Sequence, residues 1–137
     1  MKSNFRFVFD TNAIISGLLI PDSRPRQALD RAQDQGSILI SISILAELND
    51  VLSRKKFDKY LPEEKRKRFL AVMAKEAELI EITEGITECR DPKDNKFLEL
   101  AVCGHANCII SGDKDLLEMN PFRGIAILNP GEFLRKY

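Results

Sequence analysis

The sequence predicts an α/β fold, a three-layer α/β/α sandwich built around a mainly parallel central sheet. Short apolar runs, such as FRFVF at residues 5–9, alternate along the chain with longer segments whose apolar residues recur at helical spacing. Strands that alternate with helices form parallel sheets with helices on their faces. The 137 residues contain no repeat and no long linker, so we expect a single domain over residues 1–137.

Five segments are expected to be strands because they are short, apolar and bounded by polar or turn-forming residues. In chain order they are residues 5–9 (FRFVF), 37–41 (SILIS), 77–82 (AELIEI), 107–113 (NCIISGD) and 124–128 (GIAIL).

Seven segments between and after these strands are expected to be helical. In chain order they are residues 11–19, 23–36, 43–54, 62–73, 91–105, 114–119 and 130–137. Pro21 ends the first, Gly36 follows the second, and the third has Ile44 and Leu48 at helical spacing. Pro62 occupies a first helical position, and Asp91 precedes Pro92 as an N-cap.

Composition excludes several classes of protein. No apolar stretch approaches the roughly 20 residues of a membrane helix, and MKSNFRFVFD lacks the apolar segment of a signal peptide. We therefore expect a cytoplasmic protein with no membrane partner. The three cysteines have no disulfide or zinc-site spacing, and are expected to be small buried residues. His105 is the only histidine, which excludes chemistry that needs two; a surface or helix-capping role is expected.

The net charge is zero, with 21 basic and 21 acidic residues, which argues against binding nucleic acid by bulk electrostatics. Eight cations nevertheless fall between residues 54 and 68: Arg54, Lys55, Lys56, Lys59, Lys65, Arg66, Lys67 and Arg68. Two interpretations remain open for this basic segment. It forms two solvated helical faces around a turn, which is the favoured interpretation, or it contacts phosphates.

Acidic residues follow two of the expected strands. Asp10 ends the first strand, Asp113 follows CIIS with Asp115 close behind, and Asp94 lies in the first turn of the helix that Asp91 opens. In open α/β sheets, functional sites gather at the carboxyl ends of the strands. Taken singly, Asp10, Asp91 and Asp113 are equally well explained as N-caps, and Asp94 as a complement to the helix dipole.

Glu47 lies on the edge of an apolar stripe of its predicted helix, about 40° from Val51 on a wheel of 100° per residue. A partly desolvated carboxylate needs a partner, and no basic residue precedes Arg54 on that helix. A metal ion or a lysine distant in sequence would supply the missing charge.

Together, Asp10, Glu47, Asp94 and Asp113 are able to converge on one crevice, where close carboxylates need cations between them. Oxygen ligands select hard cations such as Mg²⁺ or Mn²⁺. Such ions activate water and stabilise displacement at phosphorus. The chain has no pair of histidines, cysteine nucleophile motif or glycine-rich phosphate loop, so metal-assisted phosphodiester hydrolysis is the simplest chemistry.

Four blocks of the sequence resemble the signature blocks of PIN-domain ribonucleases, in that family's order and at its spacing. They are VFDTNAIISGLL, SISILAELNDVL, DPKDNKFLELA and IISGDKDLL. The resemblance is closest to the stand-alone prokaryotic branch that includes VapC-like toxins. It implies that Asp10, Glu47, Asp94 and Asp113 are the metal-binding acids. It also implies supporting roles for Asn12 and Ser111, and capping or supporting roles for Asp91 and Asp115.

The resemblance implies a Mg²⁺- or Mn²⁺-dependent endoribonuclease that cleaves single-stranded RNA or exposed RNA loops. Candidates for contacts with the RNA backbone are Lys114, Arg54, Lys55 and Lys56. The resemblance also implies the toxin of a toxin–antitoxin pair, with an antitoxin protein as partner, and a homodimer or higher homo-oligomer.

Three alternatives to this hypothesis make different demands on the sequence. A receiver-type phosphorylation domain needs adjacent acids after its first strand, whereas this chain has Asp10-Thr11-Asn12. A phosphatase of the haloacid dehalogenase type needs an aspartate where Asn12 stands. A non-catalytic RNA- or protein-binding module on the same fold, in which the acids only cap helices, remains open.

Overall fold

The central sheet has five strands, and all of its paired neighbours are parallel. The computed structural model describes residues 3–137, so the first two residues of the predicted domain 1–137 lie outside the described residues. The strands are β1 (Phe5–Phe9), β2 (Gly36–Ile40), β3 (Glu78–Leu79), β4 (Cys108–Ile110) and β5 (Ala126–Leu128), in the order β3-β2-β1-β4-β5. The predicted fold class is confirmed.

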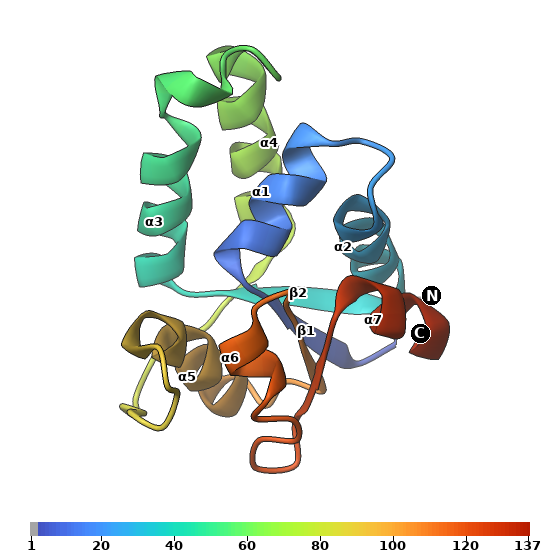
Figure 1. Cartoon of the computed structure of the whole chain (residues 1–137), viewed down its shortest axis with the longest axis vertical. Helices are drawn as coiled ribbons and strands as arrows, with labels where there is room; N and C mark the ends of the chain where they lie inside the picture. Colours follow the sequence, from blue (N-terminus) through green and yellow to red (C-terminus); the bar gives the residue numbers. More distant parts are fainter. Residues whose placement is uncertain (1–2) are drawn as a thin grey trace.

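Helices cover both faces of the sheet (Figure 1). On one side lie α1 (Thr11–Leu19), α2 (Arg24–Gln35), α3 (Ile42–Leu52) and α4 (Glu63–Glu76). On the other side lie α5 (Asn95–Cys103) and α6 (Lys114–Leu117), and α7 (Pro130–Lys136) packs beside α2. Short 3₁₀ turns form η1 (Lys55–Phe57) and η2 (Pro92–Asp94). No helix within residues 3–137 is long and apolar enough to cross a membrane.

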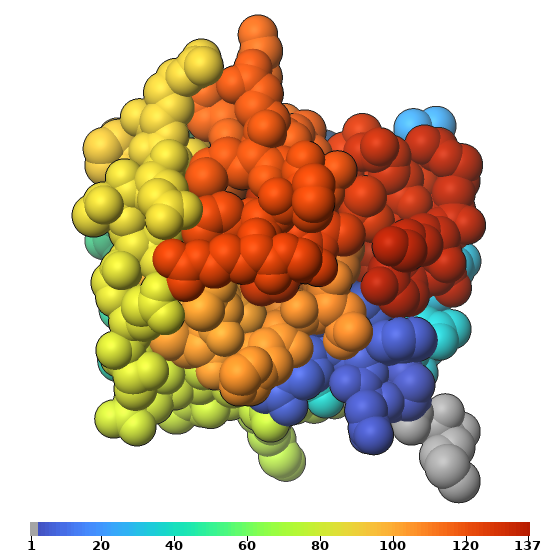
Figure 2. Space-filling model, turned by 90° about the horizontal axis from the view of Figure 1, so that it is seen from below, coloured from blue at the N-terminus to red at the C-terminus, as the bar shows by residue number. Residues whose placement is uncertain are grey.

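Phenylalanine side chains of β1, near the N-terminus, pack against the C-terminal helix α7. Phe7 and Phe9 point to one face, where their rings meet Phe133 of α7 edge-on at centroid distances of 5.1 and 6.2 Å. Phe5 packs against Tyr137 in the same way, at 5.2 Å. Figure 2 shows the result, with β1 in blue beside the C-terminal helix in red. The aromatic packing therefore fixes α7 over the start of the sheet.

The strand order reverses direction between β1 and β4, which makes this junction the topological switch point of the sheet. Phe9 pairs with Ile110, and the Asp10 N–H donates to the Ile110 carbonyl at 3.1 Å. The residues that follow β1 and β4 are therefore held side by side at the carboxyl edge of the sheet.

Several predicted boundaries are wrong by a few residues. The third strand is only Glu78–Leu79 rather than 77–82, because β2, its only neighbour, ends at Ile40. The helix predicted at 43–54 is α3, and its N-cap is Ser41, whose Oγ accepts from the Ile44 N–H at 3.2 Å. Pro62 is an N-cap rather than the first helical residue. The helix predicted from Asp91 begins as the turn η2 before α5.

The histidine and two of the three cysteines lie where the sequence indicates, whereas Cys103 is not buried as expected. All three cysteines are free, with Cys89 and Cys108 buried and Cys103 partly exposed. His105 is exposed directly after α5 and adopts a left-handed conformation with φ of 53°.

Arg66 contradicts the interpretation of the basic segment as a set of surface cations, because its side chain is fully buried. Its Nε donates to the Leu52 carbonyl at 2.8 Å, and its Nη2 donates to the Arg54 carbonyl at 3.3 Å and to Asp58 Oδ1 at 3.0 Å. Nη1 donates to the Leu61 carbonyl. Arg66 thereby fastens the C-terminal end of α3 and the following turn to α4, satisfying carbonyls that the helix itself leaves open.

Other members of the basic segment form exposed i,i+4 ion pairs. Arg54 pairs with Asp50, Lys67 with Glu63 and Arg68 with Glu64. These pairs agree with the interpretation of the segment as solvated helical faces.

We expect Arg66→Met to lower the free energy of unfolding by about 3 kcal/mol, because it leaves buried carbonyls without donors. Arg68→Met is the matched control on the same helix and should cost no more than about 0.5 kcal/mol, since its ion pair is exposed. Urea unfolding measures both values. Equal losses in the two variants would contradict the structural role of Arg66.

Candidate functional site

The four acids that the sequence singled out line one cavity of about 180 Å³ at the switch point. Asp10 follows β1, Asp113 follows β4, Asp94 ends η2, and Glu47 projects from α3. The other residues around this acidic cavity are Thr11, Asn12, Asp91, Lys93 and Lys96. Residues from four separate segments therefore meet in one place.

Asp10 is 4% exposed and both of its carboxylate oxygens are engaged. Oδ1 accepts from the Ala13 N–H at 2.8 Å, which caps α1, and Oδ2 accepts from the Ser111 hydroxyl. The pKa of Asp10 is raised above its ordinary value, chiefly because burial penalises the charged form. The bonds from Ser111 and Ala13 oppose this rise, and the charge of Asp113 adds to it.

Ser111 connects the two strand ends. Its buried hydroxyl donates to Asp10 and accepts from the Asp113 N–H at 2.9 Å. Asp113 in turn caps α6, with Oδ1 accepting from the Asp115 N–H at 2.8 Å. The capping interpretations of Asp10 and Asp113 are thus correct, and both residues line the acidic cavity as well.

Asp94 differs from the other aspartates because it precedes α5 without making a capping hydrogen bond. Its Oδ2 is buried and has no hydrogen-bond partner among the described residues. The pKa of Asp94 is raised to about 6, first by burial and then by the charges of Asp113 and Asp91. The charge of Asp10 favours the neutral form further.

Asp91 and Asp115, the two aspartates expected to have capping or supporting roles, differ in whether they line the acidic cavity. Asp91 lines the acidic cavity, and its Oδ1 accepts from the Lys93 N–H at 3.1 Å as the cap of η2. Asp115 does not line the cavity, and its Oδ1 lies 3.9 Å from Arg90 Nη1.

Glu47 has the distant lysine as its partner. Lys96 Nζ, from α5, donates to Glu47 Oε2, and the same ammonium lies 5.5 Å from the centre of the Phe97 ring. Sequence reasoning missed Lys96, although it stands two residues after Asp94 in the same block. Within residues 3–137, no three acid, cysteine or histidine side chains already converge as a ready cage for an ion. The Lys96 contact draws one of the four acids aside.

The donors around the acidic cavity nevertheless fit a hard divalent cation. They are carboxylate and hydroxyl oxygens, the ligands that Mg²⁺ and Mn²⁺ prefer. Two buried oxygens at this site, Asp94 Oδ2 and Thr11 Oγ1, have no partner among the described residues. A buried carboxylate oxygen without a donor is costly unless a positive charge faces it, so Asp94, with Asp10 and Asp113 in the same cavity lining, has the chemistry to hold a cation.

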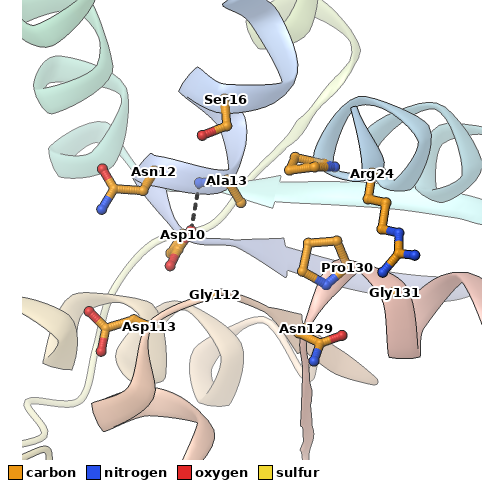
Figure 3. A pocket seen from close by; sticks show the side chains of 11 residues that line it. Asp10, Asn12, Ala13, Ser16, Arg24, Gly112, Asp113, Asn129, Pro130 and Gly131 are labelled. Atoms are coloured by element: carbon orange, nitrogen blue, oxygen red, sulfur yellow. Dashed lines mark hydrogen bonds between the residues drawn. The ribbon is translucent and has the colours of Figure 1, made fainter. Parts of the chain in front are cut away.

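A larger cavity of about 520 Å³ adjoins the acidic one and shares Asp10, Asn12 and Asp113 with it. Figure 3 shows that Arg24, Pro130 and Gly131 border it away from the side where Asp113 lies. Its volume is within the range of small-molecule sites, so it offers room for a substrate group next to the acids.

The cations proposed from the sequence as RNA contacts lie outside both cavities. Lys114, Arg54, Lys55 and Lys56 are exposed, and none of them lines either cavity. Arg54 is about 10 Å beyond Glu47 along the axis of α3, at 1.5 Å per residue. The cations that do line the cavities are Arg24, Lys93 and Lys96.

In metal-free buffer at pH 7.5, we expect Asp94→Asn to raise the free energy of unfolding by about 2 kcal/mol. The pKa of the folded state is about 6, above the unfolded value, so folding disfavours the ionised carboxylate at neutral pH. The wild type regains this stability as the pH falls through 6 towards 4, and the advantage of the variant should shrink over that range. Urea unfolding at several pH values measures it.

The matched control for this prediction is Asp34→Asn, at an exposed position of α2. It should change the free energy of unfolding by less than about 0.5 kcal/mol at each pH. A destabilised Asp94→Asn variant at pH 7.5, or a gain that does not vary with pH, would contradict the buried, charge-crowded environment of Asp94.

The chain is similar to several known proteins in sequence or in structure. A PIN domain family model matches residues 6–115. The uncharacterised protein MJ1680 of Methanocaldococcus jannaschii is 34% identical over 120 residues, which are 86% of this chain and 77% of that protein. A chain of VapBC2 from Rickettsia felis bound to a promoter DNA fragment has a TM-score of 0.61 at 16% identity, covering 91% of this chain and 98% of that one. A chain of DNA-bound VapBC from Salmonella typhimurium has a TM-score of 0.63 at 16% identity, covering 92% and 98%. The chain belongs to the PIN-domain family.

Proposed function

We propose that this protein is a metal-dependent endoribonuclease that uses Mg²⁺ or Mn²⁺ to hydrolyse phosphodiester bonds of single-stranded or loop RNA. The observation that carries the proposal is that Asp10, Asp94 and Asp113 line one cavity at the switch point, with one carboxylate oxygen of Asp94 buried and unpaired. PIN domains are generally nucleases and typically use divalent metal ions, which agrees with this set of oxygen donors.

In this proposal Asp94, Asp113 and Asp10 would hold the cation, with Glu47, which is paired with Lys96, as a further candidate ligand. The cation supplies positive charge that lowers the pKa of water and offsets the negative charge that develops on the phosphate. Ser111 keeps Asp10 and Asp113 in place by contacting both. Asn12, exposed and bordering both cavities, presents its amide to the substrate.

Lys96 balances negative charge in the proposed mechanism. Its ammonium neutralises Glu47 while the site is without a cation, which reduces repulsion among the acids. With a cation at Glu47, the ammonium would be available to face a phosphate oxygen of the substrate. Lys96 would then offset negative charge on the protein in one state and on the RNA in the other.

The proposal also covers the partner protein and the assembly of this chain. Similar solved structures come from VapBC complexes, and we propose that this chain is likewise the toxin of a toxin–antitoxin pair, with an antitoxin protein as partner and a homodimer or higher homo-oligomer as its assembly. The net charge of zero agrees with recognition of a local RNA feature rather than binding along any polyanion.

We expect Asp10→Asn to reduce Mn²⁺-supported cleavage of a single-stranded RNA by about 100-fold or more, because the variant loses the ligand charge. The fold should survive, since an asparagine oxygen still accepts from the Ala13 N–H. Cleavage is measured with a fluorescently labelled RNA, and thermal unfolding checks the fold. The control is Asp22→Asn, at an exposed loop position.

Excess EDTA should abolish cleavage by the wild type. Full activity in EDTA, or in Asp10→Asn, would overturn the proposed mechanism. Failure of the folded wild type to bind Mn²⁺ in a titration would favour the non-catalytic binding module instead.

A further inference from the structure

Two arginines from different helices meet at the rim of the larger cavity. Arg24 is the first residue of α2 and Arg135 lies in the last turn of α7. A methyl group added to Gly131 would lie 3.2 Å from Arg24 Nη1 and 3.6 Å from Arg135 Nη1. Both guanidinium groups therefore flank the same point, over a residue that has no side chain to separate them.

Neither of these guanidinium groups has a partner within residues 3–137. Arg24 and Arg135 make no ion pair with an acid, no side-chain hydrogen bond and no contact with an aromatic ring. Arg6, Arg26, Arg54, Arg66, Arg68, Arg90 and Arg123 each pair with an acid, and Arg31 donates to the Leu134 carbonyl. Among the described arginines, only the two that meet over Gly131 are unsatisfied.

Two adjacent like charges without a counter-ion repel each other, and a bound anion between them removes that repulsion. The planar fork of a guanidinium matches the oxygens of a phosphate, which it binds through two parallel hydrogen bonds. Glu132, which follows Gly131 in the chain, is already engaged, because its Oε1 accepts from the Asn129 N–H at 3.0 Å in a capping box. The arginine pair is therefore suited to an anion from outside the chain.

The position of the arginine pair indicates which anion it would bind. Arg24 and Gly131 line the same cavity of about 520 Å³ as Asp10 and Asp113, and Figure 3 shows the guanidinium of Arg24 beside Gly131 across the cavity from Asp113. A strand whose scissile phosphate lies at the acids extends its neighbouring nucleotide into this cavity. The arginine pair borders this cavity away from Asp113, on the side where the next phosphate of such a strand would lie.

We infer that Arg24 and Arg135 form a binding site for the backbone phosphate next to the scissile one in a single-stranded RNA. The inference rests on the proposed nuclease function, and deepens it by fixing one side of the cavity as the path of the strand. Arg24 and Arg135 are positioning residues, since they bind the strand away from the reacting atoms.

The test measures RNA binding in EDTA, where no cleavage occurs, by fluorescence anisotropy of a labelled single-stranded hexanucleotide. Arg24→Met and Arg135→Met should each weaken binding about tenfold, the range of a charge-assisted hydrogen bond. Each substitution should also lower the slope of log affinity against log salt by about one. Arg24→Lys, which keeps the charge but loses the fork, should restore part of the affinity. The matched control is Lys75→Met, an exposed cation of α4 outside both cavities.

A second arm identifies the phosphate. Hexanucleotides in which one phosphate at a time is replaced by an uncharged methylphosphonate are bound to the wild type and to the Arg24→Met/Arg135→Met variant. One position should weaken wild-type binding about tenfold and leave the double variant unaffected, because the same contact is already lost. Inorganic phosphate competing equally well with the hexanucleotide would overturn the assignment to RNA.

The outcomes separate this inference from the proposed function. In Mn²⁺ the double variant should show a raised KM with kcat retained, and thermal unfolding should match the wild type because both side chains are exposed. Cleavage with unchanged KM and unchanged hexanucleotide affinity would overturn the phosphate site and leave the nuclease proposal standing. Loss of binding in the variants, without cleavage by the wild type, would uphold the phosphate site and overturn the nuclease.

Discussion

The Ser111 hydroxyl is the contact on which the site depends, because it joins the ends of two strands that are distant in sequence. It donates to Asp10 and accepts from the Asp113 N–H, so the two carboxylates keep a fixed relation to each other. The parallel pairing of β1 with β4 brings Ser111 to this position, and the aromatic packing of Phe7 and Phe9 on Phe133 holds β1 against α7. Core packing thus determines the separation of the acids, and the buried hydroxyl refines it.

The question of whether the strand-end aspartates are caps or site residues has a physical answer, since a carboxylate has two oxygens. Asp113 caps α6 with Oδ1 and still lines the acidic cavity. Asp94, by contrast, makes no capping hydrogen bond. Its Oδ2 is unpaired, and its pKa is raised to about 6, chiefly by burial. The capping bond from Ala13 opposes the rise in the pKa of Asp10, whereas Asp94 has no such bond and is held at a cost in stability, a feature typical of functional positions.

Local patterns in the sequence predict the strands, most helices and the acids at strand ends, since each depends on residues close together in the chain. The Glu47–Lys96 contact joins residues 49 positions apart, and only the packing of α3 near α5 reveals it. The burial of Arg66 does not follow from its place in the basic segment. Helical spacing does indicate it, because Arg66, Leu70 and Met73 share one helical stripe, and all three are buried. The pairing of Arg24 with Arg135 likewise depends on α2 packing against α7, which no local pattern encodes.

The cations of this chain, which has no net charge, are unevenly divided between paired and unpaired positions. In the basic segment, Arg54, Lys67 and Arg68 are neutralised by acids one helical turn away, and Arg66 is buried. Arg24 and Lys93 line the cavities without an acidic partner among the described residues. Exposed charges are screened beyond about 10 Å at ordinary ionic strength, so the potential at the cavities is set by the few cations that line them rather than by the net charge. In the proposed function these unpaired cations beside the acids are the ones placed to meet a phosphate.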